Sequence, residues 1–143
     1  MANVFDIAAY ITNYIEVDQL KLQKLLFYTQ AVSLVRFNKP AFSSAIEAWD
    51  YGPVIPEVYT KIKRYKTPLK IKYATKESID ACIIEAADMV IKYYGEMDGI
   101  ELMQLTHSEQ PWRNAYKKGR NTEITNRAIK AYYKTIFIFD ENE

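Results

Sequence analysis

The sequence predicts a mainly α, single compact domain of six or seven helices with a small two-stranded β element. Apolar residues recur at helical spacing along most of the chain. Only four Gly and five Pro interrupt its 143 residues, which favours long helices over many turns. No repeat, low-complexity segment or linker-like stretch marks a boundary, so residues 1–143 are expected to form one domain around one core.

Two helices are expected in the N-terminal quarter. Val4, Ile7 and Ile11 recur at helical spacing, and Asn3 is placed to cap that helix. A second helix is expected from Asp18, as its N-cap, to about Phe37. It carries apolar residues on most of its faces, which is typical of a central helix packed on several sides by other helices.

The middle of the chain predicts the β element. Ala45 to Tyr51 alternates and is aromatic, and the Gly52-Pro53 pair ends it. A helix should then start near Val54, with its prolines in the first turn, and run to about Tyr65. Leu69, Ile71 and Tyr73 alternate with lysines, so residues 69–73 are expected to pair with 45–51 as a two-stranded sheet.

The C-terminal half predicts further helices. Thr75 is the expected N-cap of an amphipathic helix that Gly95 ends, and Asp98 caps a short helix over 99–106. The next helix is expected from about Ser108 to Tyr116, with Pro111 in its first turn, and Thr122 is expected to cap the last. The expected core face of the last helix consists of Ala128, Ile129, Tyr132, Tyr133, Ile136 and Phe137.

The formal net charge is +1, but the charges are segregated along the chain. Residues 58–76 hold seven basic residues and no acidic one, and 77–112 hold eight acidic residues against Lys92. Residues 113–134 hold seven basic residues against Glu123. Two interpretations stay open: neighbouring helices that neutralise each other, or a bipolar surface that meets a partner.

The composition leaves little room for catalysis. With one Cys and one His, the chain cannot supply a usual structural zinc site, and no metal or other cofactor is expected. Cys82 lies on the apolar stripe of its helix and is expected to be an inert core residue. Glu47, Asp50 and Glu57 resemble acid–base carboxylates, but solvation or ion pairing is the expectation for them. No phosphate-binding glycine loop is present. We therefore expect no catalytic residues and no enzymatic activity.

The chain shows no signal for the membrane or for export. No apolar run approaches the ~20 residues of a spanning helix, and the N-terminus has no basic region before an apolar one. The single Cys82 excludes an internal disulfide. A soluble, cytoplasmic protein is expected.

Three sequence blocks stand out. The first is Lys21-Leu22-Gln23-Lys24-Leu25-Leu26-Phe27-Tyr28, the second is Glu47-Ala48-Trp49-Asp50-Tyr51-Gly52-Pro53-Val54, and the third is Leu105-Thr106-His107 followed by Pro111-Trp112. In this order and at these spacings, the chain from about Val17 to Ala115 resembles the Panacea domain, an antitoxin domain typified by SocA-like and GepA-like phage proteins.

The resemblance implies a function. It implies an antitoxin or a phage- or prophage-associated protein of a toxin–antitoxin system, one that binds a cognate toxin, expected from an adjacent gene. It also implies that some members deliver the toxin to a ClpXP-type protease. Several members carry an additional DNA-binding domain in front; the motif here begins within about 20 residues of the N-terminus, so no separate DNA-binding domain is expected.

The residues implied as scaffold or partner contacts come from the three blocks. They are Lys21, Leu22, Lys24, Leu25, Tyr28, Trp49, Tyr51, Gly52, Pro53, Thr106, His107, Pro111 and Trp112. Both Trp49 and Trp112 are expected to be substantially buried.

Two site questions stay open at this point. Lys21, Lys24 and Tyr28 either form a solvent-facing edge, or Lys24 and Tyr28 converge with Trp49 and Tyr51 on a groove beside the Gly-Pro turn. His107 either shapes a helix end, contacts a partner, or acts as a general base. The alternative function is a small nucleic-acid-binding module that uses the basic segments 58–76 and 113–134 with their interleaved tyrosines.

Overall fold

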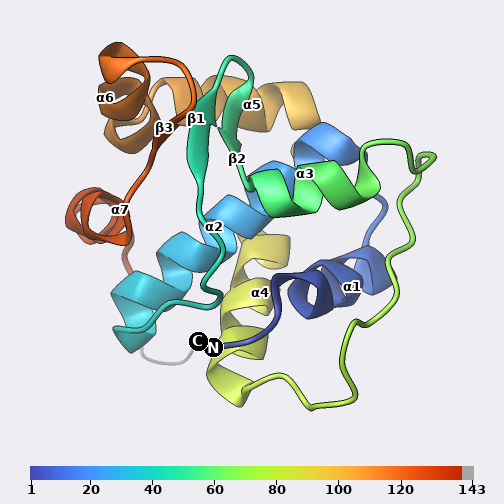
Figure 1. Ribbon diagram of the computed structural model, residues 1–143. Helices are drawn as coiled ribbons and strands as arrows, with labels where there is room; N and C mark the ends of the chain where they lie inside the picture. Colours follow the sequence, from blue (N-terminus) through green and yellow to red (C-terminus); the bar gives the residue numbers. More distant parts are fainter. Residues whose placement is uncertain (140–143) are drawn as a thin grey trace.

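A computed structural model describes residues 1–139, which fold into seven helices and a three-stranded antiparallel sheet (Figure 1). The helices are α1 (Val4–Tyr14), α2 (Gln19–Phe37), α3 (Pro56–Ile62), α4 (Ala81–Tyr94), α5 (Gly99–His107), α6 (Gln110–Lys118) and α7 (Asn126–Tyr133). The strands are β1 (Glu47–Trp49), β2 (Gly52–Val54) and β3 (Thr122–Glu123). The prediction of a mainly α domain with a minor β element is confirmed.

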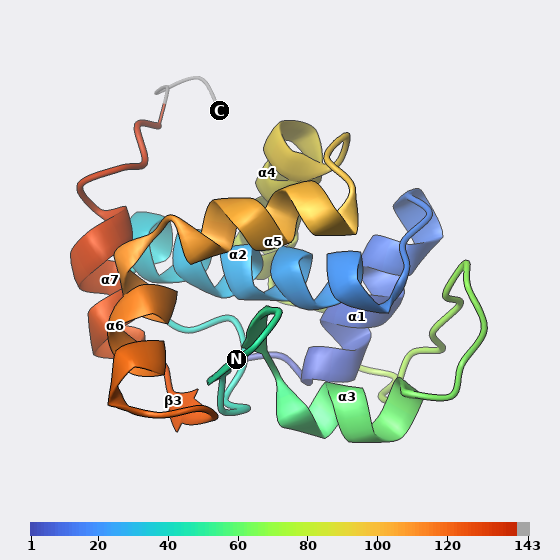
Figure 2. The same cartoon turned by 90° about the horizontal axis from the view of Figure 1, so that it is seen from above.

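Helix α2 is the centre of the molecule. It packs against α1, α4, α5, α7 and strand β2, and Figure 2 shows it running through the middle of these elements. Every residue from Leu22 to Leu34 is buried, as its apolar character on most faces predicts. Its two buried glutamines accept hydrogen bonds from backbone N–H groups before β1 and after β2. Gln30 Oε1 accepts from the Ala41 N–H at 2.7 Å, and Gln23 Oε1 accepts from the Ile55 N–H at 2.8 Å.

The sheet is built around a hairpin. Strands β1 and β2 pair antiparallel with Trp49 opposite Gly52, so Asp50 and Tyr51 form a two-residue turn. Gly52 has φ +105°, a conformation that residues with a side chain rarely adopt. Strand β3 pairs with the other edge of β1, which gives the order β2-β1-β3.

The predicted strand at 69–73 is wrong. Leu69 and Ile71 are buried, as their alternation indicates, but this segment hydrogen-bonds to α1 and the loop that follows it instead of to a strand. The Leu69 N–H donates to the Val17 carbonyl, and the Ile71 N–H donates to Thr12 Oγ1. Residues 45–51 therefore pair with β2 and β3, and the sheet has three strands instead of two.

Two predicted helix caps are also wrong. Asp80, not Thr75, caps α4, because the Thr75 hydroxyl and N–H both donate to Asp6 on α1. Thr125, not Thr122, caps α7, because the Thr122 side chain donates to the Gly119 carbonyl and its backbone joins the sheet. The caps Asn3, Asp18 and Asp98 are confirmed, and Asp98 forms a full capping box with Glu101.

The expected core face of the last helix is only partly buried. Ile129 and Tyr133 are fully buried, whereas Ile136 is 47% exposed and lies beyond the end of α7. Within residues 1–139, no helix has the length and apolar character needed to cross a membrane.

Candidate partner-binding site

The three sequence blocks meet at the tip of the β1–β2 hairpin. From α2, the Lys24 side chain runs beneath Gly52, and its Nζ donates to the Pro53 carbonyl at 3.1 Å. A Cβ on Gly52 would lie 2.5 Å from Lys24 Cε and 2.9 Å from Thr106 Oγ1 of α5. The close approach of three elements therefore requires glycine at this position, for space as well as for its positive φ.

A stack of aromatic rings holds the other side of the hairpin. Trp112 of α6 lies between His107, at a centroid distance of 3.9 Å, and Tyr116, at 4.5 Å. Its indole N–H donates to the Trp49 carbonyl on β1 at 2.8 Å. The third block thus fixes the hairpin to α5 and α6 by a ring stack and one backbone hydrogen bond.

The turn residue Asp50 is held by the end of α6 and the loop after it. Its Oδ1 accepts from the Tyr116 hydroxyl at 2.5 Å and from Arg120 Nε at 2.9 Å. The hydrogen bond from Tyr116 and the guanidinium of Arg120 lower the pKa of the Asp50 carboxyl below its usual value. Asp50 is therefore an ionised, paired carboxylate, as expected, and not a poised acid or base.

Lys24 is fully buried, which contradicts the solvent-facing alternative for this residue. It forms no ion pair with any residue in 1–139. Burial lowers the pKa of its ammonium to about 7, and the charge of Asp18 opposes that shift only in part. A buried lysine without a carboxylate partner is uncommon and marks this position for further attention.

His107 is half-buried and packs flat on Trp112, a contact that the helix-end interpretation does not include. Burial lowers the pKa of its imidazole; a hydrogen bond with the Asp50 backbone opposes this, and the charge of Lys24 adds to the lowering. Burial therefore favours the neutral form of the ring. Its buried Nε2 has no hydrogen-bond partner among residues 1–139.

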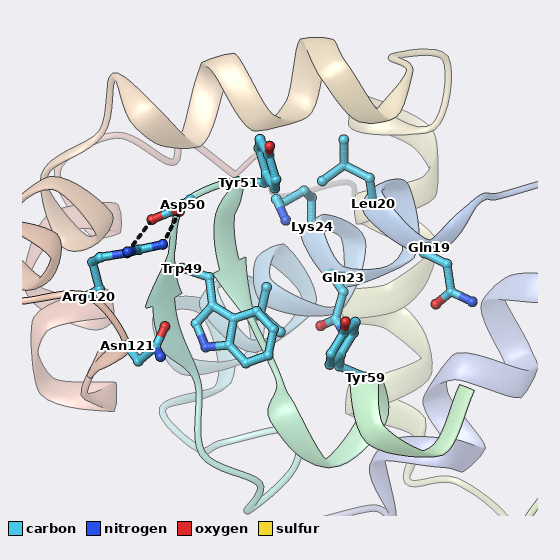
Figure 3. A pocket seen from close by; sticks show the side chains of 11 residues that line it. Gln19, Leu20, Gln23, Lys24, Trp49, Asp50, Tyr51, Tyr59, Arg120 and Asn121 are labelled. Atoms are coloured by element: carbon cyan, nitrogen blue, oxygen red, sulfur yellow. Dashed lines mark hydrogen bonds and ion pairs between the residues drawn. The ribbon is translucent and has the colours of Figure 1, made fainter. Parts of the chain in front are cut away.

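An open pocket of about 400 Å³ lies beside the hairpin (Figure 3). Helix α2 and helix α3 form one wall, the hairpin forms another, and the loop after α6 closes one end. The lining residues are Gln19, Leu20, Gln23, Lys24, Trp49, Asp50, Tyr51, Val54, Tyr59, Arg120 and Asn121. Tyr51 and Tyr59 are 69% and 41% exposed at its rim, and the Trp49 ring meets Tyr59 edge-on at 5.0 Å.

The structure brings some of the expected site residues to this pocket and not others. Lys24, Trp49 and Tyr51 line it, whereas Gly52 and Pro53 are buried outside its lining and contact the Lys24 side chain. Trp49 and Trp112 are of intermediate exposure, so most of each side chain is buried, as expected. Leu22, Leu25, Thr106 and Pro111 are buried scaffold, and Lys21 Nζ donates to the Gly95 carbonyl at the end of α4.

Tyr28 belongs to a separate interior cluster. Its hydroxyl donates to Glu109 Oε1 at 2.5 Å, and the Tyr133 hydroxyl donates to the same oxygen at 2.7 Å. Burial raises the pKa of Glu109, and the two hydroxyls oppose that shift. Tyr94 stacks on Tyr28 with the rings 4.3 Å apart. The prediction that Tyr28 converges on the groove is wrong: it ties α2 to α6 and α7.

Sequence reasoning missed several residues of the site. Gln19, Tyr59 and Arg120 line the pocket from three different elements, and Glu109 is the buried acceptor of the tyrosine cluster. The high count of twelve Tyr was the available signal, because rings with a polar tip suit such half-buried positions. Their pairing with Glu109 and Arg120 depends on contacts that are distant in sequence.

Residues 1–139 contain no group of three or more His, Cys, Asp and Glu side chains that could hold a metal ion. Cys82 is partly exposed near the start of α4 instead of lying in the core.

Comparison with known proteins places this chain. The family model described as "Antitoxin SocA-like, Panacea domain" matches residues 22–113. This chain belongs to that family. The match takes in every residue of the hairpin contacts described above except Tyr116 and Arg120.

A curated relative agrees with this assignment. Antitoxin SocA of Caulobacter vibrioides (strain NA1000 / CB15N) is 31% identical to this chain over 68% of the chain and 59% of its own length. This chain therefore matches less than two-thirds of that relative. No solved structure matches the chain significantly.

Proposed function

We propose that this chain is a cytoplasmic antitoxin that neutralises a cognate toxin by direct protein–protein binding. The observation that carries the proposal is membership of the SocA-like Panacea domain family over residues 22–113. The relative named antitoxin SocA supports an antitoxin role. The toxin itself is expected to be encoded next to this chain.

The surface around the pocket supports binding of a protein. Tyr51 and Tyr59 present exposed rings on either side of Trp49, and Arg120 lies at the end of the same pocket. Tyr, Trp and Arg are the residues enriched in the energetic centres of protein interfaces. An aromatic surface of this kind favours binding without catalysis, because none of its residues forms a nucleophile–base pair.

Growth of cells that express the neighbouring toxin tests the proposal. Co-expression of the wild-type chain should restore growth, and the double variant Tyr51→Ala/Tyr59→Ala should fail to restore it while remaining folded. The matched control is Tyr65→Ala/Tyr73→Ala, which removes two rings that are 45% and 49% exposed away from the pocket. Rescue by the first variant equal to that of the wild type would place the toxin interface elsewhere.

The antitoxin could neutralise the toxin by either of two mechanisms, and the proposal covers both. The antitoxin blocks the toxin by occupying it, or it delivers the bound toxin to a ClpXP-type protease. The half-life of the toxin separates them. Delivery shortens the half-life in the presence of the antitoxin and of ClpX, whereas blocking leaves the half-life unchanged or longer.

One observation favours a second candidate, binding of a nucleic acid. The seven basic residues between 58 and 76 are all exposed, and none forms an ion pair within residues 1–139. Tyr65 and Tyr73 are exposed among them and could stack on bases. This segment is a polyanion-binding candidate, and weaker nucleic-acid binding by the Tyr65→Ala/Tyr73→Ala variant than by the wild type would favour it.

A further inference from the structure

The ammonium of Lys24 is incompletely bonded. It has three N–H donors, and the Pro53 carbonyl at 3.1 Å is its hydrogen-bond acceptor among residues 1–139. The residue is fully buried, so water does not replace the missing acceptors. Buried ammonium groups are normally paired with a carboxylate, because an unpaired charge in the interior is costly.

The other charges of the pocket do not fill this role. Arg120 and Asp50 form an ion pair at 2.5 Å, and Asp50 also accepts from Tyr116. These two charges cancel at one end of the pocket. Lys24 is left without a carboxylate partner, and its charged form is complementary to a single carboxylate.

A second lining residue also lacks a partner. Gln19 Nε2 donates to the Ile62 carbonyl at 2.6 Å and to that of Tyr65 at 3.4 Å, which fixes the orientation of the amide. Its buried Oε1 then has no donor among residues 1–139. An acceptor of this kind fits the backbone N–H of a peptide that passes along the pocket.

The pocket is apolar between these polar groups. Leu20, Trp49, Val54 and Tyr59 line it, and Figure 3 shows Gln19 and Arg120 at opposite ends. Tyr51 lies beside Lys24 in the same view and is 69% exposed at the turn. Because Lys24 is fully buried, a ligand carboxylate reaches its ammonium only when the surrounding chain moves, and Tyr51 is the exposed residue beside it.

We propose that this pocket binds an extended internal segment of the toxin, in which an Asp or Glu carboxylate pairs with Lys24 beside an apolar side chain that packs on Trp49 and Tyr59. The identity of the partner rests on the proposed function. The chemistry of the segment rests on the pocket alone. Titration of a blocked peptide against one with a free terminal carboxylate separates an internal segment from a chain end.

Blocked peptides test the chemistry without the toxin. The probes are acetyl-Leu-Glu-Leu-amide, its Gln analogue and acetyl-Leu-Leu with a free carboxylate, each titrated into the whole chain by ¹H–¹⁵N NMR. The Glu peptide should shift the amides of the pocket saturably and bind about ten-fold or more tightly than the Gln peptide. Equal binding of these two, no shift of pocket amides, or binding of the free carboxylate alone would each overturn the proposal.

A matched pair of variants tests the role of Lys24. Lys24→Met keeps the buried stem and removes the ammonium, and Lys21→Met removes the same charge one turn earlier on α2, outside the pocket. Lys24→Met should remove the preference for Glu over Gln, and Lys21→Met should keep it. A preference that survives in a folded Lys24→Met variant would contradict the assignment.

Toxin binding separates the two levels of proposal. If the wild-type chain binds the toxin, Lys24→Met should weaken that complex by about ten- to hundred-fold, and Lys21→Met by less than about three-fold. A complex unaffected by Lys24→Met would overturn the pocket inference and leave the antitoxin function standing. Absence of any wild-type complex would overturn the function, and the peptide titrations would still decide the chemistry of the pocket.

Discussion

At the scale of single residues, two buried ionisable groups, Glu109 and Lys24, are stabilised in different ways. Glu109 receives two tyrosine hydroxyls within 2.7 Å, so its polar oxygen is satisfied from inside the molecule. The Lys24 ammonium donates to one carbonyl oxygen and to no carboxylate among residues 1–139. The first group has a structural role, and the second remains a cost to the folded state that a partner can relieve.

The stability of the free chain should therefore depend on pH through Lys24. Its pKa is about 7 in the folded state against 10.5 for an unperturbed lysine. Between these two pH values the unfolded chain binds more protons at Lys24 than the folded chain does, so the free energy of unfolding rises with pH. Below pH 7 the lysine is charged in both states, and the full free-energy cost of burying that charge destabilises the folded chain. The free energy of unfolding of Lys24→Met should therefore exceed that of the wild type by about 1–4 kcal/mol at pH 6.

Urea denaturation at pH 6, 7.5 and 9 measures this effect. The advantage of Lys24→Met should shrink as the pH rises toward 10, and Lys21→Met should show no such trend. An advantage that is the same at all three pH values would mean that Lys24 is not desolvated in the folded chain.

At the scale of elements, the hairpin depends on the Trp112 stack. Trp112→Ala removes two ring contacts and the donor to the Trp49 carbonyl, and should destabilise the fold by about 2–4 kcal/mol, less than for a fully buried Trp. Trp112→Phe keeps a ring in the stack and should cost only about 1 kcal/mol. Thermal unfolding compares them, and equal melting temperatures for Trp112→Ala and the wild type would show that the stack does not hold the hairpin.

The helices could be predicted from local sequence, and the pairing of the strands could not. Capping side chains such as Asp18 and Asp98 act on the next few residues, so their signal is local. The alternation at 69–73 correctly indicates one buried face, but a strand also needs a hydrogen-bonding neighbour. Residues 69–73 instead hydrogen-bond to Thr12 and to the Val17 carbonyl, and no local sequence pattern reveals these distant partners.

The site was predictable only in part, for a related reason. Aromatic residues beside Gly52-Pro53 indicated a surface of interest, and Trp49 and Tyr51 do line the pocket. In a helix that is apolar on most faces, the elements packed around it decide which environment each side chain enters. Lys24 and Tyr28, one turn apart, therefore end in two different environments that the sequence alone did not distinguish.

At the scale of the whole molecule, the segregation of charge is not resolved by internal pairing. The ion pairs within residues 1–139 join Arg36 to Glu85, Lys39 to Asp80 and Arg120 to Asp50, and none involves the basic residues of 58–76. The interpretation that neighbouring helices neutralise this segment finds no support in these pairs. The other interpretation, a bipolar surface that meets a protein partner, stays a prediction.

The dissociation constant of the purified complex with the neighbour-encoded toxin, measured at about 0.1 and 0.5 M salt, tests the antitoxin proposal most directly. An interface anchored by aromatic rings should weaken by less than about ten-fold over this range. A site that contacts about six phosphates should weaken by more than about 10³-fold. A stable complex at both salt concentrations is the predicted result. Absence of a toxin complex at either one, together with salt-sensitive binding of nucleic acid, would contradict it.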